Sequence, residues 1–160
     1  MHVQVESLKA RFVKYAQIWS QSKDEVEDRY PSTPQQLELA AILRDDLRAL
    51  GLAEVQLDQH GYVTATLPAT PGCEGRPVVG LLAHYDTYPG VSGQGVKPIV
   101  WRYQGGDLVL PDDPDVVIKE KENPELARFL GEEIITADLD QKIMKPSVFF
   151  CVFLQAFNIF

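Results

Sequence analysis

Apolar residues in the first third of the chain recur at intervals of three and four, which is the spacing of one helical face. One such run covers Val5–Trp19 and a second covers Leu37–Leu50. The second run follows Thr33–Gln36, in which the threonine can cap free amide groups, the proline fits the first helical turn and the last glutamine can close a capping box. Gly51 follows as a C-terminal stop. The pattern predicts two amphipathic helices, the second beginning near Pro34.

Further along the chain the period of the apolar residues changes from helical to extended. Apolar and polar residues alternate over 55–67 on both sides of a turn at His60-Gly61, so a β-hairpin is predicted. Strands are also predicted over 99–103 and 133–136, with a short helix over 126–130. Helices followed by strands indicate a layered α/β domain.

One short run differs from these because it is apolar at every position. Val78–Ala83 contains no polar side chain, and an uninterrupted apolar run is typical of a strand that is buried on both faces in the middle of a sheet. We therefore expect Val78–Ala83 to be an inner strand. If the strands that should flank it were missing, the sheet would expose an apolar edge, and self-association through that edge is a possible consequence.

Composition and charge narrow the class of protein. The chain has 160 residues, about one domain's worth, with 45% hydrophobic and 24% charged residues, which excludes a disordered or collagen-like protein. Its net charge of −8 argues against nucleic acid as a partner. Two cysteines, Cys73 and Cys151, do not make a disulfide framework. No secretory signal and no membrane-spanning run is visible, so a cytoplasmic protein without a membrane partner is expected.

The strongest candidate for chemistry is His84-Tyr85-Asp86, directly after the expected inner strand. Side chains two apart on a strand point to the same side, and sites in open α/β sheets form beyond the carboxyl ends of strands. An imidazole can bind zinc, and a carboxylate beside it can orient the ring. The spacing alone leaves two interpretations open: half of a metal site, or a histidine and an aspartate that end a strand and begin a turn.

Other motifs carry less weight. The glycines of 93–98 fit neither the dinucleotide fingerprint nor the Walker spacing. His60 precedes a turn glycine and is interpreted as a surface residue, and Cys73 has no histidine nearby to activate it. Glu132-Glu133 would face opposite sides of a strand, which argues against a paired acid and base.

Many short motifs, in order along the chain, resemble the N-terminal part of peptidase T, a family of tripeptide aminopeptidases among the co-catalytic zinc exopeptidases. The resemblance runs from about Leu8 to Asp138. It rests on Arg11-Phe12, Tyr30-Pro31-Ser32-Thr33, Leu50-Gly51-Leu52, Ala65-Thr66-Leu67-Pro68-Ala69, Ala83-His84-Tyr85-Asp86-Thr87, Ser92-Gly93, Val96-Lys97-Pro98, Tyr103-Gln104-Gly105-Gly106-Asp107 and Ile134-Ile135-Thr136-Ala137-Asp138.

The resemblance implies a fold and a site. It implies an incomplete three-layer α/β zinc-exopeptidase-like catalytic domain, with residues 1–138 as its N-terminal portion. It also implies that His84 is a zinc ligand and that Asp86 is the active-site residue that orients it. The family binds two zinc ions, and their remaining ligands and the general base cannot be placed in this chain. Residues 139–160 depart from the family and hold five of the seven phenylalanines, so they are interpreted as an unrelated apolar tail.

Three hypotheses for function follow. The first is an inactive fragment of a zinc metallopeptidase that releases the N-terminal residue of tripeptides. The second is a non-catalytic binding or regulatory module that keeps half of the peptidase fold. The third is a complete hydrolase with one zinc ion, whose further ligands would lie among Asp107, Asp112, Asp113 and Asp115.

Overall fold

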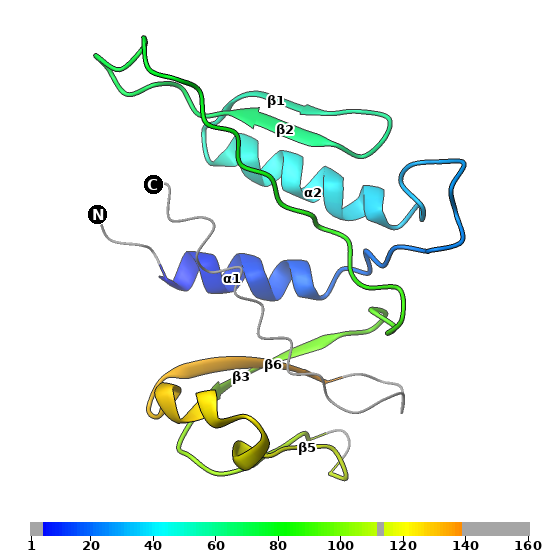
Figure 1. The fold of residues 1–160 in the computed structure, drawn as a ribbon, viewed down its shortest axis with the longest axis vertical. Coiled ribbons are helices and arrows are strands. Elements are labelled where there is room, and N and C mark those ends of the chain that lie inside the picture. The colour runs from blue at the N-terminus through cyan, green and yellow to red at the C-terminus, as the bar shows by residue number, and fades with distance from the viewer. Residues whose placement is uncertain (1–4, 112–113, 139–160) are drawn as a thin grey trace. The chain divides into compact units, whose positions relative to one another are not determined.

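The computed structural model describes residues 5–111 and 114–138, and the expected apolar tail, 139–160, lies outside them. The described residues form helices, short sheets and connecting loops (Figure 1). They divide into two units: unit 1 holds the described residues up to Ile18 and from Gln94 on, and unit 2 holds Trp19–Gly93. The prediction of a mixed α/β protein is confirmed at this level. None of the described helices is long and apolar enough to cross a membrane.

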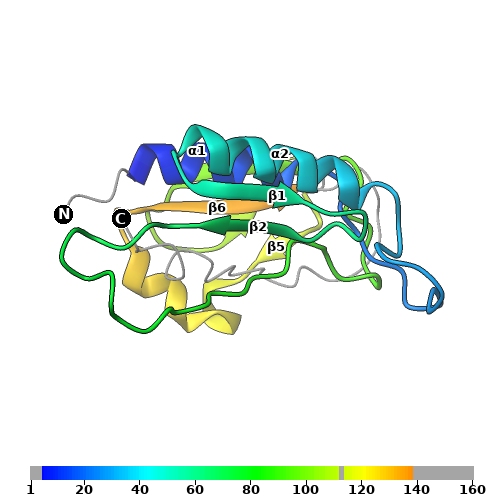
Figure 2. The ribbon, with the colours of Figure 1, turned by 90° about the horizontal axis from the view of Figure 1, so that it is seen from above.

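Unit 2 is built on helix α2 (Gln36–Ala49) and the hairpin of β1 (Ala53–Leu57) and β2 (Val63–Thr66). The two strands are antiparallel, as predicted. Figure 2 shows α2 lying over the hairpin, and Leu39 and Ala40 are the buried apolar residues of the helix. The alternating pattern of the hairpin thus provides one half-buried face for α2 to cover.

The two ends of α2 differ in how well they were predicted. Gly51 ends the helix with a φ of +81°, as expected for a residue without a Cβ. The capping box at the other end is wrong, because Gln35 occupies the N-cap and no side chain caps the helix. The Thr33 hydroxyl donates instead to the Gln21 carbonyl at 2.7 Å, and the Gln36 side chain donates to Ser32 Oγ at 3.2 Å. The Thr33 hydroxyl therefore bonds to a residue twelve positions earlier and does not cap the helix.

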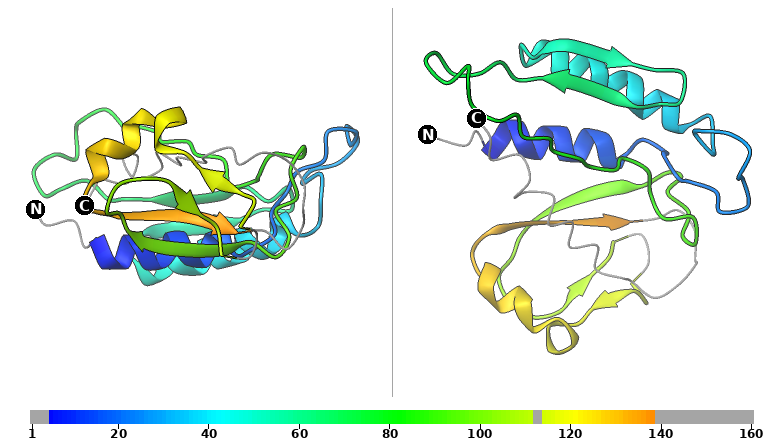
Figure 3. Two further views of the ribbon diagram at one scale, coloured as in Figure 1. Left: turned by 90° about the horizontal axis from the view of Figure 1, so that it is seen from below. Right: turned by 45° about the horizontal axis from the view of Figure 1, so that its top comes forward.

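Unit 1 contains α1 (Val5–Ala16) and two antiparallel strand pairs, which Figure 3 shows from two sides. Strand β3 (Lys97–Arg102) pairs with β6 (Glu133–Asp138), and β4 (Leu108–Val109) pairs with β5 (Val117–Ile118). Two 3₁₀ turns, Glu120–Glu122 and Pro124–Phe129, stand before β6. The predicted strands over 99–103 and 133–136 are confirmed, and the predicted short helix is the second 3₁₀ turn.

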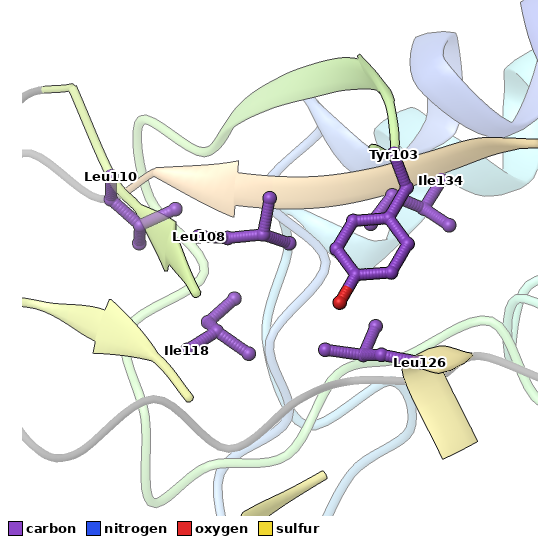
Figure 4. Close-up of a cluster of buried hydrophobic side chains, with 6 residues drawn as sticks. All are labelled: Tyr103, Leu108, Leu110, Ile118, Leu126 and Ile134. Carbon is purple, nitrogen blue, oxygen red and sulfur yellow. The ribbon is translucent and has the colours of Figure 1, made fainter. Parts of the chain in front are cut away.

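A cluster of buried side chains forms the core of unit 1 (Figure 4). Its members come from β4, β5, β6, the second 3₁₀ turn and the neighbouring loops: Tyr103, Leu108, Leu110, Ile118, Leu126 and Ile134. The ring of Tyr103 is 1% exposed, and its hydroxyl donates to the Gly106 carbonyl at 3.0 Å. The hydroxyl of Tyr103, the largest residue of this core, therefore has a hydrogen-bond partner inside unit 1.

The prediction of an inner strand over Val78–Ala83 is wrong for this structure. The segment forms no strand, and Val78 and Leu82 are 98% and 97% exposed. The described sheets are three antiparallel pairs, β1–β2, β3–β6 and β4–β5, and none of them includes Val78–Ala83. A run that is apolar on both faces needs a strand at each edge, and no described strand pairs with it.

Candidate functional site

The candidate site lies in the loop that follows the exposed segment, and a short stretch before α2 holds that loop in place. Gln21 and Thr87 form an isolated parallel bridge. The Thr87 amide donates to the Ser20 carbonyl at 3.2 Å, and the Ser22 amide donates to the Thr87 carbonyl at 3.0 Å. Residues from opposite ends of unit 2 are thereby tied together next to His84 and Asp86.

Ser20 is the most deeply buried polar contact of this connection. It is 1% exposed, and its hydroxyl donates to the Tyr85 carbonyl at 2.9 Å. A part-buried carbonyl that lost this donor would retain part of its desolvation cost without a bond. Ser20 therefore positions the backbone between His84 and Asp86.

The side-chain amide of Gln21 holds the far end of the same loop. Its nitrogen donates to the Pro89 carbonyl at 2.7 Å. Its oxygen accepts from the Gly93 amide at 3.3 Å and from the Trp19 indole at 3.2 Å. One amide group thus contacts both ends of 89–93.

Tyr85 attaches the middle of the His-x-Asp motif to the hairpin turn. Its hydroxyl donates to the Gly61 carbonyl at 2.9 Å. A Cβ at Gly61 would lie 2.6 Å from that hydroxyl oxygen, and the φ of Gly61 is +87°, so both space and backbone conformation require glycine. Burial raises the pKa of the Tyr85 phenol, and the negative charges of Asp86 and Asp58 raise it further.

The side chains of His84 and Asp86 contact each other, as their spacing predicted. Nδ1 of His84 lies 3.2 Å from Oδ1 of Asp86 and 3.0 Å from the Asp86 carbonyl oxygen. Carbonyl and carboxylate oxygens only accept hydrogen bonds, so Nδ1 carries the proton. In neutral imidazole the lone pair is then on Nε2, the nitrogen through which the ring would bind a metal ion.

The described residues do not make a complete metal site around this pair. Zinc in catalytic sites takes three protein ligands and keeps one open position. Within 5–111 and 114–138, no group of three or more His, Cys, Asp or Glu side chains comes together. The chemistry of His84 with Asp86 fits one oriented ligand.

The other candidates are located elsewhere. His60 lies in the hairpin turn against Gln59 and is exposed, as predicted, and Cys73 is exposed as well. In unit 1, Asp107 accepts from the Glu120 amide at 2.9 Å, so this carboxylate stabilises a turn. Asp112 and Asp113 lie outside the described residues.

Sequence reasoning missed Ser20, Gln21 and Gly61, which position the loop. Residues 21–29 have no apolar period, so the local sequence does not mark Gln21 as a residue with contacts. Its contacts join residues up to 72 positions apart, and no local pattern reports such a pairing. The motif Tyr30–Thr33, which carries part of the family resemblance, was the one nearby signal.

Comparison with known proteins gives the class of protein that this sequence is similar to. No protein-family model matches the chain. Curated relatives do match it, and each of those compared is named peptidase T. The chain is 45% identical over 129 residues to peptidase T of Geobacillus sp. (strain WCH70), and 46% identical over 129 residues to that of Brevibacillus brevis; both matches cover 80% of this chain and 31% of the relative. Peptidase T of Listeria monocytogenes is 45% identical over 134 residues, which is 83% of this chain and 32% of the relative.

The resemblance to peptidase T is confirmed by these matches. The chain spans about a third of the length of the curated relatives it matches. Coverage of this extent agrees with a likeness to the N-terminal part of peptidase T.

Proposed function

We propose that residues 1–138 are the N-terminal portion of the catalytic domain of a zinc-dependent tripeptide aminopeptidase with a three-layer α/β fold, acting on short peptides in the cytoplasm. In this proposal His84 is a metal ligand and Asp86 is the active-site carboxylate that orients it. The observation that carries the proposal is the contact of Nδ1 of His84 with Oδ1 of Asp86 at 3.2 Å, within a sequence 45% identical to peptidase T.

The role of each residue follows from this geometry. Asp86 holds the proton on Nδ1 and so directs the Nε2 lone pair outward from the contact. Two bonds hold Tyr85, the middle residue of the motif: Ser20 donates to its carbonyl, and its hydroxyl donates to the Gly61 carbonyl. These bonds limit the positions that the imidazole can take, which is what a metal ligand requires.

We further propose that the 160-residue chain does not hydrolyse peptides by itself. One oriented ligand does not hold a catalytic zinc ion, no group of three or more His, Cys, Asp or Glu side chains comes together in the described residues, and the general base of the family cannot be placed in this sequence. Loss of a general base alone costs roughly 10²–10⁴-fold in rate. The test is hydrolysis of a free tripeptide by the full chain with added zinc or cobalt. We expect no turnover; turnover that His84→Ala and Asp86→Ala abolish would contradict the proposal.

A chimera tests the claim that residues 1–138 are the N-terminal portion of a peptidase catalytic domain. Residues 1–138 would replace the matched region of the Geobacillus peptidase T, which supplies the rest of the chain. We expect tripeptide hydrolysis that His84→Ala abolishes, while His60→Ala, a change at the exposed histidine of the hairpin turn, leaves it intact. An inactive but folded chimera would favour the alternative, a non-catalytic binding or regulatory module, which the incomplete ligand set also supports.

A further inference from the structure

The most exposed apolar surface in the described part of unit 2 is the segment Val78–Ala83, called the open segment below. Figure 1 shows it in green as a stretched trace after β2. Four large side chains are largely exposed: Val78 98%, Val79 80%, Leu81 65% and Leu82 97%. Because neighbours in an extended chain point to opposite sides, both faces of the open segment are apolar and accessible. Soluble proteins rarely leave such a surface without a function or a partner.

The backbone of the open segment is suited to strand pairing. No backbone hydrogen bond joins 77–83 to another described residue. The segment has no internal proline and no charge, and Gly80 is not among the glycines with positive φ. Just beyond it, Thr87 already pairs with Gln21 in a strand-like bridge. An extended apolar segment with unpaired amides and carbonyls is the form in which a chain adds to another strand.

The charges at the two ends of the open segment point to one occupant. Arg76 precedes it and Asp86 follows it. Two copies paired antiparallel about Leu81 bring Arg76 of each copy opposite Asp86 of the other. We propose that the open segment pairs in this way with the same segment of a second copy of the chain, giving a dimer with a two-fold axis at Leu81.

The antiparallel arrangement is favoured over a parallel one by the same charges. Parallel pairing in register would place Arg76 beside Arg76 and Asp86 beside Asp86, and like charges directly opposite destabilise a sheet. In the antiparallel register Val79 lies opposite Ala83, on the same face as Leu81, so each copy covers apolar surface of the other. The contact is the same patch on both subunits and therefore closes as a dimer.

Sedimentation of the full chain over a range of concentrations is the first test. We expect a monomer–dimer equilibrium that Leu81→Lys abolishes, because two lysines would meet at the axis. Leu130→Lys is the matched control, since Leu130 in unit 1 is 63% exposed, and it should leave the equilibrium unchanged. A chain that stays monomeric at all concentrations, or an association that Leu81→Lys does not affect, would overturn the proposal.

Disulfide trapping tests the register. In a Cys73→Ser, Cys151→Ser background, Leu81→Cys should form a dimer under mild oxidation because the two positions face each other. Val79→Cys lies on the same face, but its two copies would be four residues apart along the strands, about 13 Å, which is beyond disulfide reach. Equal trapping by both variants would indicate parallel pairing and overturn the proposed register.

Exchanging the charges of Arg76 and Asp86 tests whether these two residues face each other in the dimer. Arg76→Asp should weaken the dimer about tenfold, because an opposite-charge pair becomes a like-charge pair at both ends. Arg76→Asp combined with Asp86→Arg should restore the original affinity. A double variant as weak as the single one would show that these residues do not face each other, and the proposed register would be wrong.

Discussion

The core of unit 1 and the open segment of unit 2 contain the same kinds of side chain in opposite surroundings. Leu126 in the core of unit 1 is 2% exposed, whereas Leu82 in the open segment is 97% exposed. The difference lies in the elements available to each: β3 and β6 pair along their whole length, while no described strand lies along Val78–Ala83. A run of apolar residues is buried only where the chain supplies its neighbours.

The largest effect that this comparison predicts is on stability. Leu126→Ala should lower the free energy of unfolding by about 2–5 kcal/mol, because it opens a cavity in a packed core. Leu82→Ala makes the same chemical change at an exposed position and should stay within about 0.5 kcal/mol of the original chain. Urea unfolding followed by Trp fluorescence and by circular dichroism, at a concentration where the chain is monomeric, measures both. Equal losses would show that Leu82 is buried in solution.

A smaller effect is expected at the contact that holds the candidate site. Ser20→Ala removes the donor to the Tyr85 carbonyl and should cost about 1–3 kcal/mol in urea unfolding, because a part-buried acceptor is left unpaired. Ser22→Ala is the matched control, since its exposed hydroxyl shares the Thr87 carbonyl with a backbone amide. We expect the control to change stability by less than about 0.5 kcal/mol. If the two variants behave alike, the loop is not held through Ser20.

The smallest effect concerns Tyr85 and has a pH dependence. Tyr85→Phe removes the bond to the Gly61 carbonyl and should cost about 0.5–1.5 kcal/mol near neutral pH. Because burial raises the pKa of the Tyr85 phenol above its ordinary value of 10.0, the folded chain keeps a proton that the unfolded chain releases. The contribution of the Tyr85 phenol to the free energy of unfolding is therefore fully present below pH 10. It is lost as the pH rises through the raised pKa.

The alkaline loss of stability should be reduced in Tyr85→Phe but not abolished. Burial also raises the pKa of Tyr103 in the core of unit 1, so a second group contributes in the same direction. Tyr30→Phe, at a residue 66% exposed, is the control and should keep the full alkaline loss. The measurement is the urea midpoint between pH 8 and about pH 11. An unchanged alkaline loss in Tyr85→Phe would contradict the assignment.

The sequence predicted the elements whose burial depends on a local pattern, and it failed where burial depends on distant parts of the chain. Amphipathic elements such as β1, β2 and β3 were predicted because each needs only one apolar face covered, and their periods are local. The inner strand over Val78–Ala83 failed because its burial depends on neighbouring strands, which a local pattern does not contain. The capping box failed because the Thr33 hydroxyl is used by Gln21, a residue outside the helix.

Within the candidate site, the sequence predicted the contact between two nearby residues but not the long-range contacts that hold the loop. The spacing of two led to the expectation that His84 and Asp86 converge, and their side chains do contact each other, although the strand on which that expectation rested is not formed. The residues that hold the loop were not found, because the Ser20 contact joins positions 65 apart and the Gln21 contacts join positions 68 and 72 apart. Such pairings become visible only when the chain is folded.

A zinc titration of the full chain by calorimetry, beside His84→Ala, tests the central claim most directly. The claim is that the chain supplies one oriented ligand of a larger metal site. We predict weak binding that does not saturate at one ion per chain and that His84→Ala removes, because a single imidazole with its carboxylate does not hold zinc tightly. Tight stoichiometric binding by the original chain would show a complete metal site and contradict the account.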